Sequence, residues 1–310
     1  MNGISLLAAL KAFDATARLG SMTQAAKQLG LQQPTVSAHV LRLEQEFEVE
    51  LFHRRGRRLE LSGFGCLLLE QTRRVFSGEE DAQALLLAAR QHYVGRLQIH
   101  AIGPYNVLPI LKHYRLRMPN VNLSVAVADS QTIISRILDW RGDVGIVLGA
   151  PVDPQLFRMP LRKQALVVFC HKHHPLAAKT AITMKDLAGQ GLVSREEGST
   201  TRRVFEQTLR KHQVTMRTVL EMGSREAVRE AVAQGFGIGV VAQPAYIADE
   251  RLVQLPLADA TMHTEVHVVC RQERSQVPLI QAFIEAARLF STDTKRIQDT
   301  GSDPCKAGLM

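Results

Sequence analysis

One stretch near the amino terminus carries side chains suited to hydrogen bonding with the edges of nucleic-acid bases. Gln33 can pair with adenine, the methyl group of Thr35 can contact thymine, and Arg42 can reach a phosphate or a guanine. A recognition helix needs such short polar groups on its outer face. The residues expected on that face are Gln33, Thr35, Ser37, Ala38, His39 and Arg42.

A basic loop follows this stretch. Residues 1–62 hold 8 Lys and Arg against 6 Asp and Glu, and half of those positive charges fall at Arg54, Arg55, Arg57 and Arg58. Arginines at this density suit phosphates or a minor groove, and a solvated basic loop is the alternative. The whole chain of 310 residues has a formal charge of +8, which permits a nucleic acid or an anionic ligand without proving either.

Four short polar segments open predicted helices farther along the chain. They are residues 103–106, 129–132, 198–202 and 223–225. Helix N-termini present unpaired N–H groups and the positive end of the helix dipole, so they favour anions. Alternatively, each Ser or Thr only caps its own helix. Arg202 and Arg225 could clamp a carboxylate or phosphonate bidentately, although an exposed position on the helix surface is the ordinary alternative, more so for Arg202.

Other chemistry finds little support. His171, His173 and His174 are too close together in one loop for the usual zinc geometry, and the four cysteines form no C-x-x-C pair. The chain has no G-x-S-x-G or P-loop motif, and no G-x-G-x-x-G in the context of a dinucleotide-binding fold. We therefore predict no enzymatic activity, no metal site and no cofactor.

The elements that must position the first two groups form a small helical module over residues 1–62. Gly20 ends a first helix, and Ser21 caps a second one in a capping-box pattern with Gln24, unless Thr23 is the cap. Gly30 ends that helix and Pro34 opens the next, which buries Val36, Val40 and Leu43. Alternating residues across 49–62 indicate a small hairpin, so a winged helix-turn-helix is expected.

A long helix is predicted over residues 63–92. Leu68, Val75, Ala82 and Ala89 recur every seven residues, with Thr72, Glu79 and Leu86 between them. This stripe favours dimerisation, and packing against the chain's own residues is the alternative.

The remainder alternates between strands and helices and predicts an α/β domain with a mainly parallel sheet. Residues 93–292 would form two lobes around a cleft, lobe I from about 93–161 and 265–292 and lobe II from about 162–264. The polar residues 293–310 are expected to be a mobile tail.

Several motifs together resemble the LysR-type transcriptional regulators. The amino-terminal part is similar to that family's winged helix-turn-helix, and the resemblance extends into the family's two-lobed, periplasmic-binding-protein-like effector domain. The residues that carry the resemblance are 20–26, 33–37, 43–44, 51–54 and 58–65, followed by 142–146, 174–177 and 233–241.

The resemblance implies a site for double-stranded DNA and a second site for a small effector between the lobes. The implied DNA contacts are Thr23, Gln33, Pro34, Thr35, Ser37, His39, Arg42, Arg54, Arg55, Arg57 and Arg58. The implied effector contacts are Pro104, Tyr105, Asn106, Ser130, Gln131, Ser199, Thr200, Thr201, Arg202, Ser224 and Arg225. A homodimer or homotetramer and contact with RNA polymerase are also implied.

Residues 102–105, 195–202 and 221–228 are similar to a LysR-type branch associated with aminoethylphosphonate catabolism. This similarity suggests a phosphonate effector, and a carboxylate or amino acid is the alternative. A binding protein of transport type is a rival interpretation, but no signal-peptide pattern or long apolar run supports export or membrane insertion. We therefore expect a cytoplasmic protein. An enzyme with an appended DNA-binding module is a second rival.

Overall fold

The structure is a computed structural model that describes residues 3–55, 58–90 and 93–300. Within these ranges, the side chains of residues 3–5, 54–55, 58 and 292–300 are not described. The chain divides into two units, residues 1–86 with 139–141 and residues 87–138 with 142–310. The long helix after the wing therefore groups with the amino-terminal unit.

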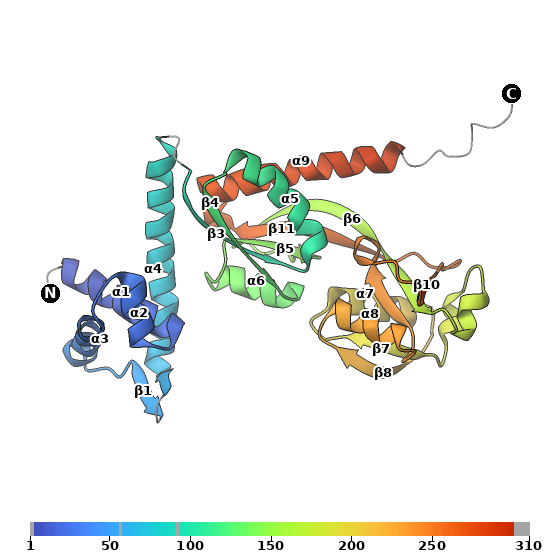
Figure 1. Cartoon of the computed structure of the whole chain (residues 1–310), viewed down its shortest axis with the longest axis horizontal. Helices are drawn as coiled ribbons and strands as arrows, with labels where there is room; N and C mark the ends of the chain where they lie inside the picture. The colour runs from blue at the N-terminus through green and yellow to red at the C-terminus, as the bar shows by residue number, and fades with distance from the viewer. Residues whose placement is uncertain (1–2, 56–57, 91–92, 301–310) are drawn as a thin grey trace. The chain divides into compact units, whose positions relative to one another are not determined.

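The amino-terminal unit begins with three short helices and a hairpin, and ends with a long helix (Figure 1). Its elements are α1 (Gly3–Leu19), α2 (Met22–Leu29), α3 (Gln33–Phe47), β1 (Phe52–Arg55), β2 (Arg58–Leu61) and α4 (Gly63–Ala88). Ser21 is the cap of α2, because its hydroxyl accepts a hydrogen bond from the backbone N–H of Gln24. Gly30 ends α2 at φ 66°, where its N–H bonds back to the carbonyls of Ala26 and Lys27.

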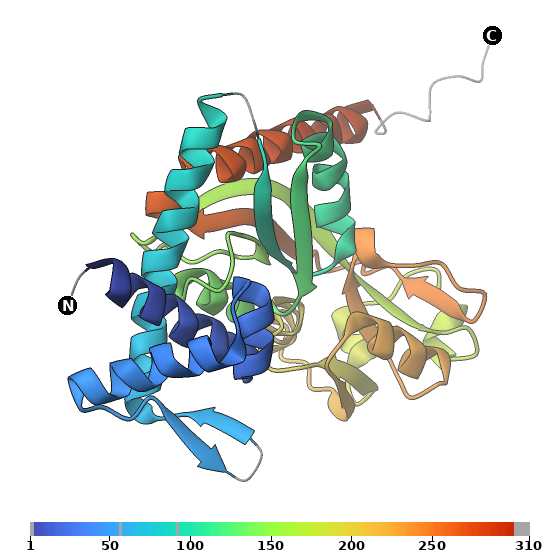
Figure 2. The same cartoon turned by 60° about the vertical axis from the view of Figure 1, so that its left-hand side comes forward.

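The turn between α2 and α3 and the hairpin confirm the predicted winged helix-turn-helix. Val36, Val40 and Leu43 are buried, as their spacing predicts. β1 and β2 pair antiparallel, and Figure 2 shows them as a separate hairpin beside the helices.

Helix α4 is anchored to α1 of its own unit. Thr72 is buried and donates a hydrogen bond of 3.1 Å to Asp14, while Glu79 pairs with Lys11 at 2.7 Å. Two members of the predicted stripe thus contact the chain itself, which is the alternative considered for this helix. Val75 and Leu86 of the same stripe remain exposed.

The second unit is built on a seven-stranded sheet with the order β10-β6-β11-β5-β3-β4, in which β9 also pairs with β6. A separate parallel pair joins β7 and β8. The strands are β3 (Gly95–Ala101), β4 (Val121–Val127), β5 (Val144–Leu148), β6 (Leu156–His171), β7 (Gly191–Arg195), β8 (Arg217–Met222), β9 (Gly239–Ala242), β10 (Leu252–Leu255) and β11 (His263–Arg271).

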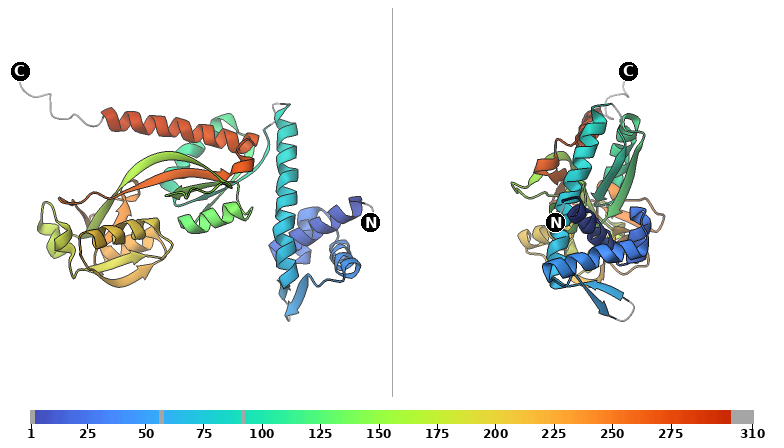
Figure 3. Two further views of the ribbon diagram at one scale, coloured as in Figure 1. Left: turned by 180° about the vertical axis from the view of Figure 1, so that it is seen from behind. Right: turned by 90° about the vertical axis from the view of Figure 1, so that its left-hand side faces the viewer.

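Helices cover this sheet on both sides. In lobe I, α5 and α9 lie together on one face and α6 on the other (Figures 1 and 3). The helices of the unit are α5 (Pro104–Arg117), α6 (Ser130–Leu138), α7 (Thr200–Lys211), α8 (Arg225–Ala233) and α9 (Pro278–Thr300), with short 3₁₀ turns at Pro175–Ala178, Met184–Leu187, Gln243–Ala245 and Gln272–Arg274.

Two long strands join the lobes. β6 and β11 pair antiparallel and run through both predicted lobe boundaries, near residues 161–162 and 264–265 (Figure 3). Buried apolar residues form one cluster in lobe I, centred on β3, β5 and α9, and two further clusters in lobe II. The α/β fold with two lobes is therefore as predicted.

Two structural predictions need correction. The large sheet is mixed, because only β3, β4 and β5 run parallel in it while β6, β9, β10 and β11 pair antiparallel. The segment predicted as a mobile tail begins inside α9, which continues to Thr300, and residues 301–310 lie outside the described residues. None of the described helices combines the length and apolar character that a membrane crossing requires.

Candidate nucleic-acid interface and ligand cavities

Helix α3 presents most of its predicted recognition residues to solvent. Gln33, Pro34, Thr35 and Arg42 are exposed, and Ser37 and His39 are half-buried. The helix starts at Gln33 with proline in its first turn, where the missing N–H is not needed. Arg42 lies within 3.4 Å of Glu46 one turn later. Thr23 is exposed in the first turn of α2.

The outward face of α3 also includes an apolar residue that our prediction left out. Leu41 is 50% exposed, one turn after Ser37 and next to the exposed Ala38 in helical spacing. An exposed leucine on a recognition helix can contact a thymine methyl group. The only sequence signal was its position, four residues beyond Ser37.

The wing places its arginines on two paired strands. Arg54 pairs with Leu59 and Arg55 with Arg58, while Arg57 lies outside the described residues. A two-stranded ribbon of this kind can follow a phosphate backbone or enter a groove. Within β1, His53 contacts Glu50 at 2.7 Å.

Eight of the eleven predicted effector residues line two neighbouring cavities of the second unit. Leu148 lines both. The outer cavity has a volume of about 260 Å³ and lies where α6 and α7 begin. Four predicted residues line it: Ser130, Gln131, Ser199 and Thr200.

The hydroxyl groups of the outer cavity already have protein partners. Ser130 accepts a hydrogen bond from the N–H of Leu148 at 2.9 Å, and Ser199 caps α7 through the N–H of Arg202. Thr200 contacts the carbonyl of Leu148 at 3.4 Å. Two helix N-termini therefore converge here, but these side chains also hold the two lobes and the helix ends in place.

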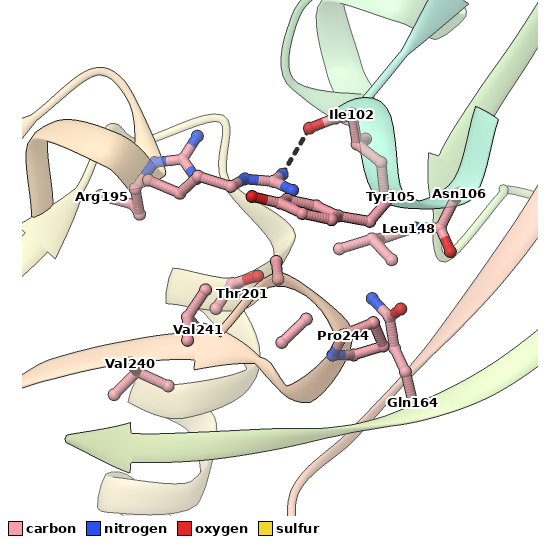
Figure 4. Close-up of a pocket in the computed structure, with 13 residues that line it drawn as sticks. Ile102, Tyr105, Asn106, Leu148, Gln164, Arg195, Thr201, Val240, Val241 and Pro244 are labelled. Atoms are coloured by element: carbon pink, nitrogen blue, oxygen red, sulfur yellow. Dashed lines mark hydrogen bonds between the residues drawn. The ribbon is translucent and has the colours of Figure 1, made fainter. Parts of the chain in front are cut away.

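The inner cavity is much smaller, about 10 Å³, which is the space of one water. Tyr105, Asn106, Thr201 and Arg225 line it, as predicted, and Figure 4 shows the Tyr105 ring across its middle. Asn106 accepts a hydrogen bond of 2.5 Å from Arg162. The remaining walls are largely apolar and include Ile102, Leu148, Val240, Val241, Ala242, Pro244 and Ala245.

Arg225 connects the lobes across this cavity. Its Nη2 donates to the carbonyl oxygen of Ile102, where the dashed line of Figure 4 ends. Among the described residues it forms no salt bridge with a carboxylate, although the side chain is partly buried. Burial lowers the pKa of its guanidinium, and the nearby positive charge of Arg195 lowers that pKa further. Glu226, Tyr105 and Glu196 raise the pKa of the guanidinium and so act in the opposite direction.

Three predicted effector residues line neither cavity. Ser224 caps α8 by accepting from the N–H of Ala227, which is the alternative role foreseen for it. Arg202 pairs with Glu206 at 2.8 Å and with Glu221 at 2.7 Å, as a surface arginine would. Pro104 is the first residue of α5 and has no part in either lining.

Two residues that the sequence did not single out line the inner cavity. Gln164 comes from β6, and its side chain points into the cavity in Figure 4. Arg195 comes from the end of β7 and is held by a two-pronged contact with Glu196, whose oxygens lie 2.6 and 2.5 Å away. Arg195 begins the segment 195–202 that carries the resemblance to the phosphonate-associated branch, but it was not predicted as an effector contact. No motif marks Gln164, so only the fold could reveal it.

The histidine-rich loop does not form a metal centre within the described residues, where no group of three potential ligands gathers. His171 and His173 lie near each other, with ring centroids 5.2 Å apart, whereas His174 caps the 3₁₀ turn that follows it.

A winged helix-turn-helix joined to a two-lobed α/β domain with interlobe cavities defines a ligand-responsive DNA-binding protein. Comparison with known protein families agrees with this description. Residues 7–66 match the bacterial regulatory helix-turn-helix of the lysR family, and residues 90–290 match the LysR substrate binding domain. The chain belongs to the LysR family of transcriptional regulators, which is not a family of enzymes. This membership confirms the resemblance seen in the sequence.

Individual relatives share only a modest part of their sequence with this chain, between 22% and 28% in the three cases that follow. The chain is 28% identical to the HTH-type transcriptional regulator CysL of Bacillus subtilis over 237 residues, which cover 76% of this chain and 79% of CysL. A full-length OxyR variant from Pseudomonas aeruginosa has the same fold, with a TM-score of 0.73, 22% identity and coverage of 91% and 94%. The regulatory domain of CcmR from Synechocystis PCC6803, in complex with 2-PG, aligns with a TM-score of 0.59 and 26% identity over 64% of this chain and 98% of that domain.

Proposed function

We propose that this LysR-family regulator changes its engagement of DNA when a small anion binds between its two lobes, and that the anion is a phosphonate such as 2-aminoethylphosphonate. The regulated process would then be phosphonate catabolism. The observation that carries the proposal is the partly buried guanidinium of Arg225, which lacks a carboxylate partner within the described part of the chain.

DNA contact in this proposal comes from the exposed face of α3 and from the wing. Base edges are read by α3, and the wing arginines lie along phosphates. The regulator acts in the cytoplasm as a homodimer or homotetramer, and it contacts RNA polymerase. Pairing of two chains would place two copies of α3 in successive major grooves. The exposed Val75 and Leu86 of α4 support the pairing of two copies.

The nature of the anion has support from one relative. The CcmR regulatory domain was solved in complex with 2-PG. The residues that line the two cavities here would equally serve a carboxylate, so a carboxylate or amino acid is the second candidate.

The test is thermal unfolding of the full chain with a panel of small anions, because a ligand that binds only the folded state must raise the midpoint. We expect 2-aminoethylphosphonate to raise it, and Arg225→Gln to lose most of that shift while DNA binding without ligand is retained. A lost charge-assisted pair of this kind costs about 1.5–3 kcal/mol, or about ten- to a hundredfold in affinity.

The matched control is Arg210→Gln, since Arg210 is exposed in the last turn of helix α7 and lines neither cavity. It should leave the shift intact. A shift with carboxylates alone would replace the phosphonate proposal by the second candidate. An equal loss in both variants would remove Arg225 from the site.

A further inference from the structure

The inner cavity contains a buried hydrogen-bond acceptor without a donor. Gln164 is 6% exposed, and its Oε1 has no partner among the described residues. Figure 4 shows the amide reaching from β6 into the cavity. An unsatisfied buried polar atom raises the free energy of the folded state, so native proteins almost always supply it with a partner, a water or a ligand.

Arg225 presents the complementary feature in the same cavity. It is a donor whose partner in this structure is a neutral backbone carbonyl, that of Ile102. The other cation in the lining, Arg195, is already neutralised by Glu196. Among the described residues, one group in the cavity thus has no salt-bridge partner, although Glu226 and Glu196 act on it electrostatically, and another group has no hydrogen-bond donor.

The space around these groups is small. Its lining combines polar side chains with apolar ones such as Leu148, Val240 and Pro244, and the free volume of about 10 Å³ admits no more than a water. A ligand larger than a water can therefore enter only if the surrounding residues move, and we expect the contact between Arg225 and Ile102 to break as they do.

Gly103 is where that contact meets lobe I. A Cβ atom at this position would lie 2.5 Å from Nη1 of Arg225. The absence of a side chain lets the guanidinium rest against the backbone of lobe I. An oxoanion would take over the place of the Ile102 carbonyl and bond to the same side of the guanidinium.

We infer that the inner cavity takes a small aliphatic oxoanion that also carries a hydrogen-bond donor, with Arg225 holding the oxoanion and Gln164 accepting from the donor. The donor is an ammonium or a hydroxyl group. This inference rests on the proposed function and deepens it, because it specifies which part of the ligand each residue selects. Ligand binding exchanges an interlobe hydrogen bond for bonds to the ligand, so occupancy and lobe arrangement are linked.

The experiment compares two ligand pairs that differ in the donor alone. The pairs are 2-aminoethylphosphonate with ethylphosphonate, and β-alanine with propionate. Dissociation constants for the full chain are measured by calorimetry for the native sequence and for Gln164→Leu, which removes the acceptor at similar size. In one pair or both, we expect the amino member to bind the native chain at least tenfold more tightly. In Gln164→Leu this ratio should fall to about one, while the affinity for the plain anion stays within twofold.

The control is Thr264→Val. Thr264 faces Gln164 in the pairing of β6 with β11, is 4% exposed and also has an unpartnered Oγ1, but it does not line the cavity. This variant should keep the tenfold ratio. If Gln164→Leu does not fold, Gln164→Met repeats the test with an unbranched side chain.

Three results would overturn the inference. The first is a ratio of dissociation constants near one in the native chain, and the second is a tenfold ratio that survives in Gln164→Leu. The third is a Gln164→Leu variant that is more stable than the native chain, together with no binding of either amino compound, which would mean that the cavity holds water only. Failure of the proposed function is recognised separately, since a ligand could show the predicted ratio and still leave DNA binding unchanged.

Discussion

The two units of this regulator hold their binding residues in opposite environments. The amino-terminal unit exposes its recognition groups: Gln33, Thr35 and Arg42 stand on the surface of α3, over a core formed by Val36 and Val40. The second unit encloses its groups, so that Gln164 and Arg225 lie in a cavity that they help to fill.

In the second unit, but not in the first, the selection of a partner is linked to the stability of the fold. An exposed side chain is hydrated in the free protein, so its removal affects the complex and leaves folding almost unchanged. A buried group without its partner raises the free energy of the folded state, so a ligand that satisfies it stabilises the fold as it binds. The second unit should therefore respond to its ligand as a change in stability, and the first should respond to DNA mainly through charge.

The largest expected effect comes from opening a cavity in either core. Phe13 is fully buried against Phe52, at 5.5 Å between ring centroids, and Phe283 is fully buried against Tyr114 at 6.0 Å. Phe13→Ala and Phe283→Ala should each cost about 3–5 kcal/mol of unfolding free energy. We expect Phe13→Ala to weaken DNA binding and spare ligand binding, and Phe283→Ala to do the reverse.

Differential scanning calorimetry measures the stability of the two variants. Fluorescence anisotropy measures their DNA binding, and calorimetric titration measures their ligand binding. The two variants serve as each other's control because the deleted atoms are the same. If either substitution lowered both activities equally, the units would fold as one, and the contrast between them would lose its basis.

The sequence predicts the first unit better than the second because its signals are local. Ser21 and Gly30 cap and end α2 through contacts within a few residues, and the spacing of Val36 and Val40 identifies the buried face of α3. Such features depend on neighbouring residues alone. The exposed recognition face then follows as the opposite side of the helix.

The first half of β6 shows why the second unit was harder. Residues 156–165 contain Pro160, and a proline argues against a central strand when the sequence is read alone. In the structure the pairing with β11 shifts register between Val266 and His267, so Pro160 lies beside a bulge where its missing N–H is tolerated. Gln164 belongs to this stretch, and its role depends on a strand pairing about 100 residues apart in sequence.

The end of the carboxyl-terminal helix was missed for a different reason. Polar composition over residues 293–300 suggested a tail, but α9 is already formed by Pro278–Phe290 and its extension adds one hydrogen bond for each residue fixed. Propagation from a packed helix needs no apolar face of its own. The apolar pattern therefore predicts the packed part of α9 and not its end.

A smaller effect separates base reading from charge within the first unit. Gln33→Ala should cost about 1–3 kcal/mol on the preferred site and little on random DNA, because a bidentate contact to a base is lost. The double variant Arg54→Ala with Arg55→Ala should weaken binding to every sequence and reduce the salt slope by about two, since each phosphate contact contributes about 0.9.

Binding-site selection from a random duplex pool supplies the preferred site, and anisotropy at several salt concentrations gives both quantities. Gln28→Ala is the matched control for Gln33→Ala, as the same exposed side chain is removed from α2. Should both sets of variants weaken specific and random DNA alike, α3 and the wing would not divide the work in this way.

The smallest effect is a pH dependence confined to the second unit. The Nδ1 atom of His174 accepts a hydrogen bond from the N–H of Leu176, and burial lowers the pKa of this histidine below its ordinary value of 6.5. The unfolded chain thus binds the proton more readily than the folded one. The contribution of this histidine to stability is therefore complete above pH 6.5 and declines as the pH falls below it.

Thermal unfolding from about pH 7.5 to about pH 5 should show this decline in the native chain. The decline should be reduced in His174→Asn, whose side-chain oxygen can accept the same hydrogen bond without titrating. If the two proteins lost stability in parallel, another group would carry the dependence, and the half-buried acceptor at His174 would not be the cause.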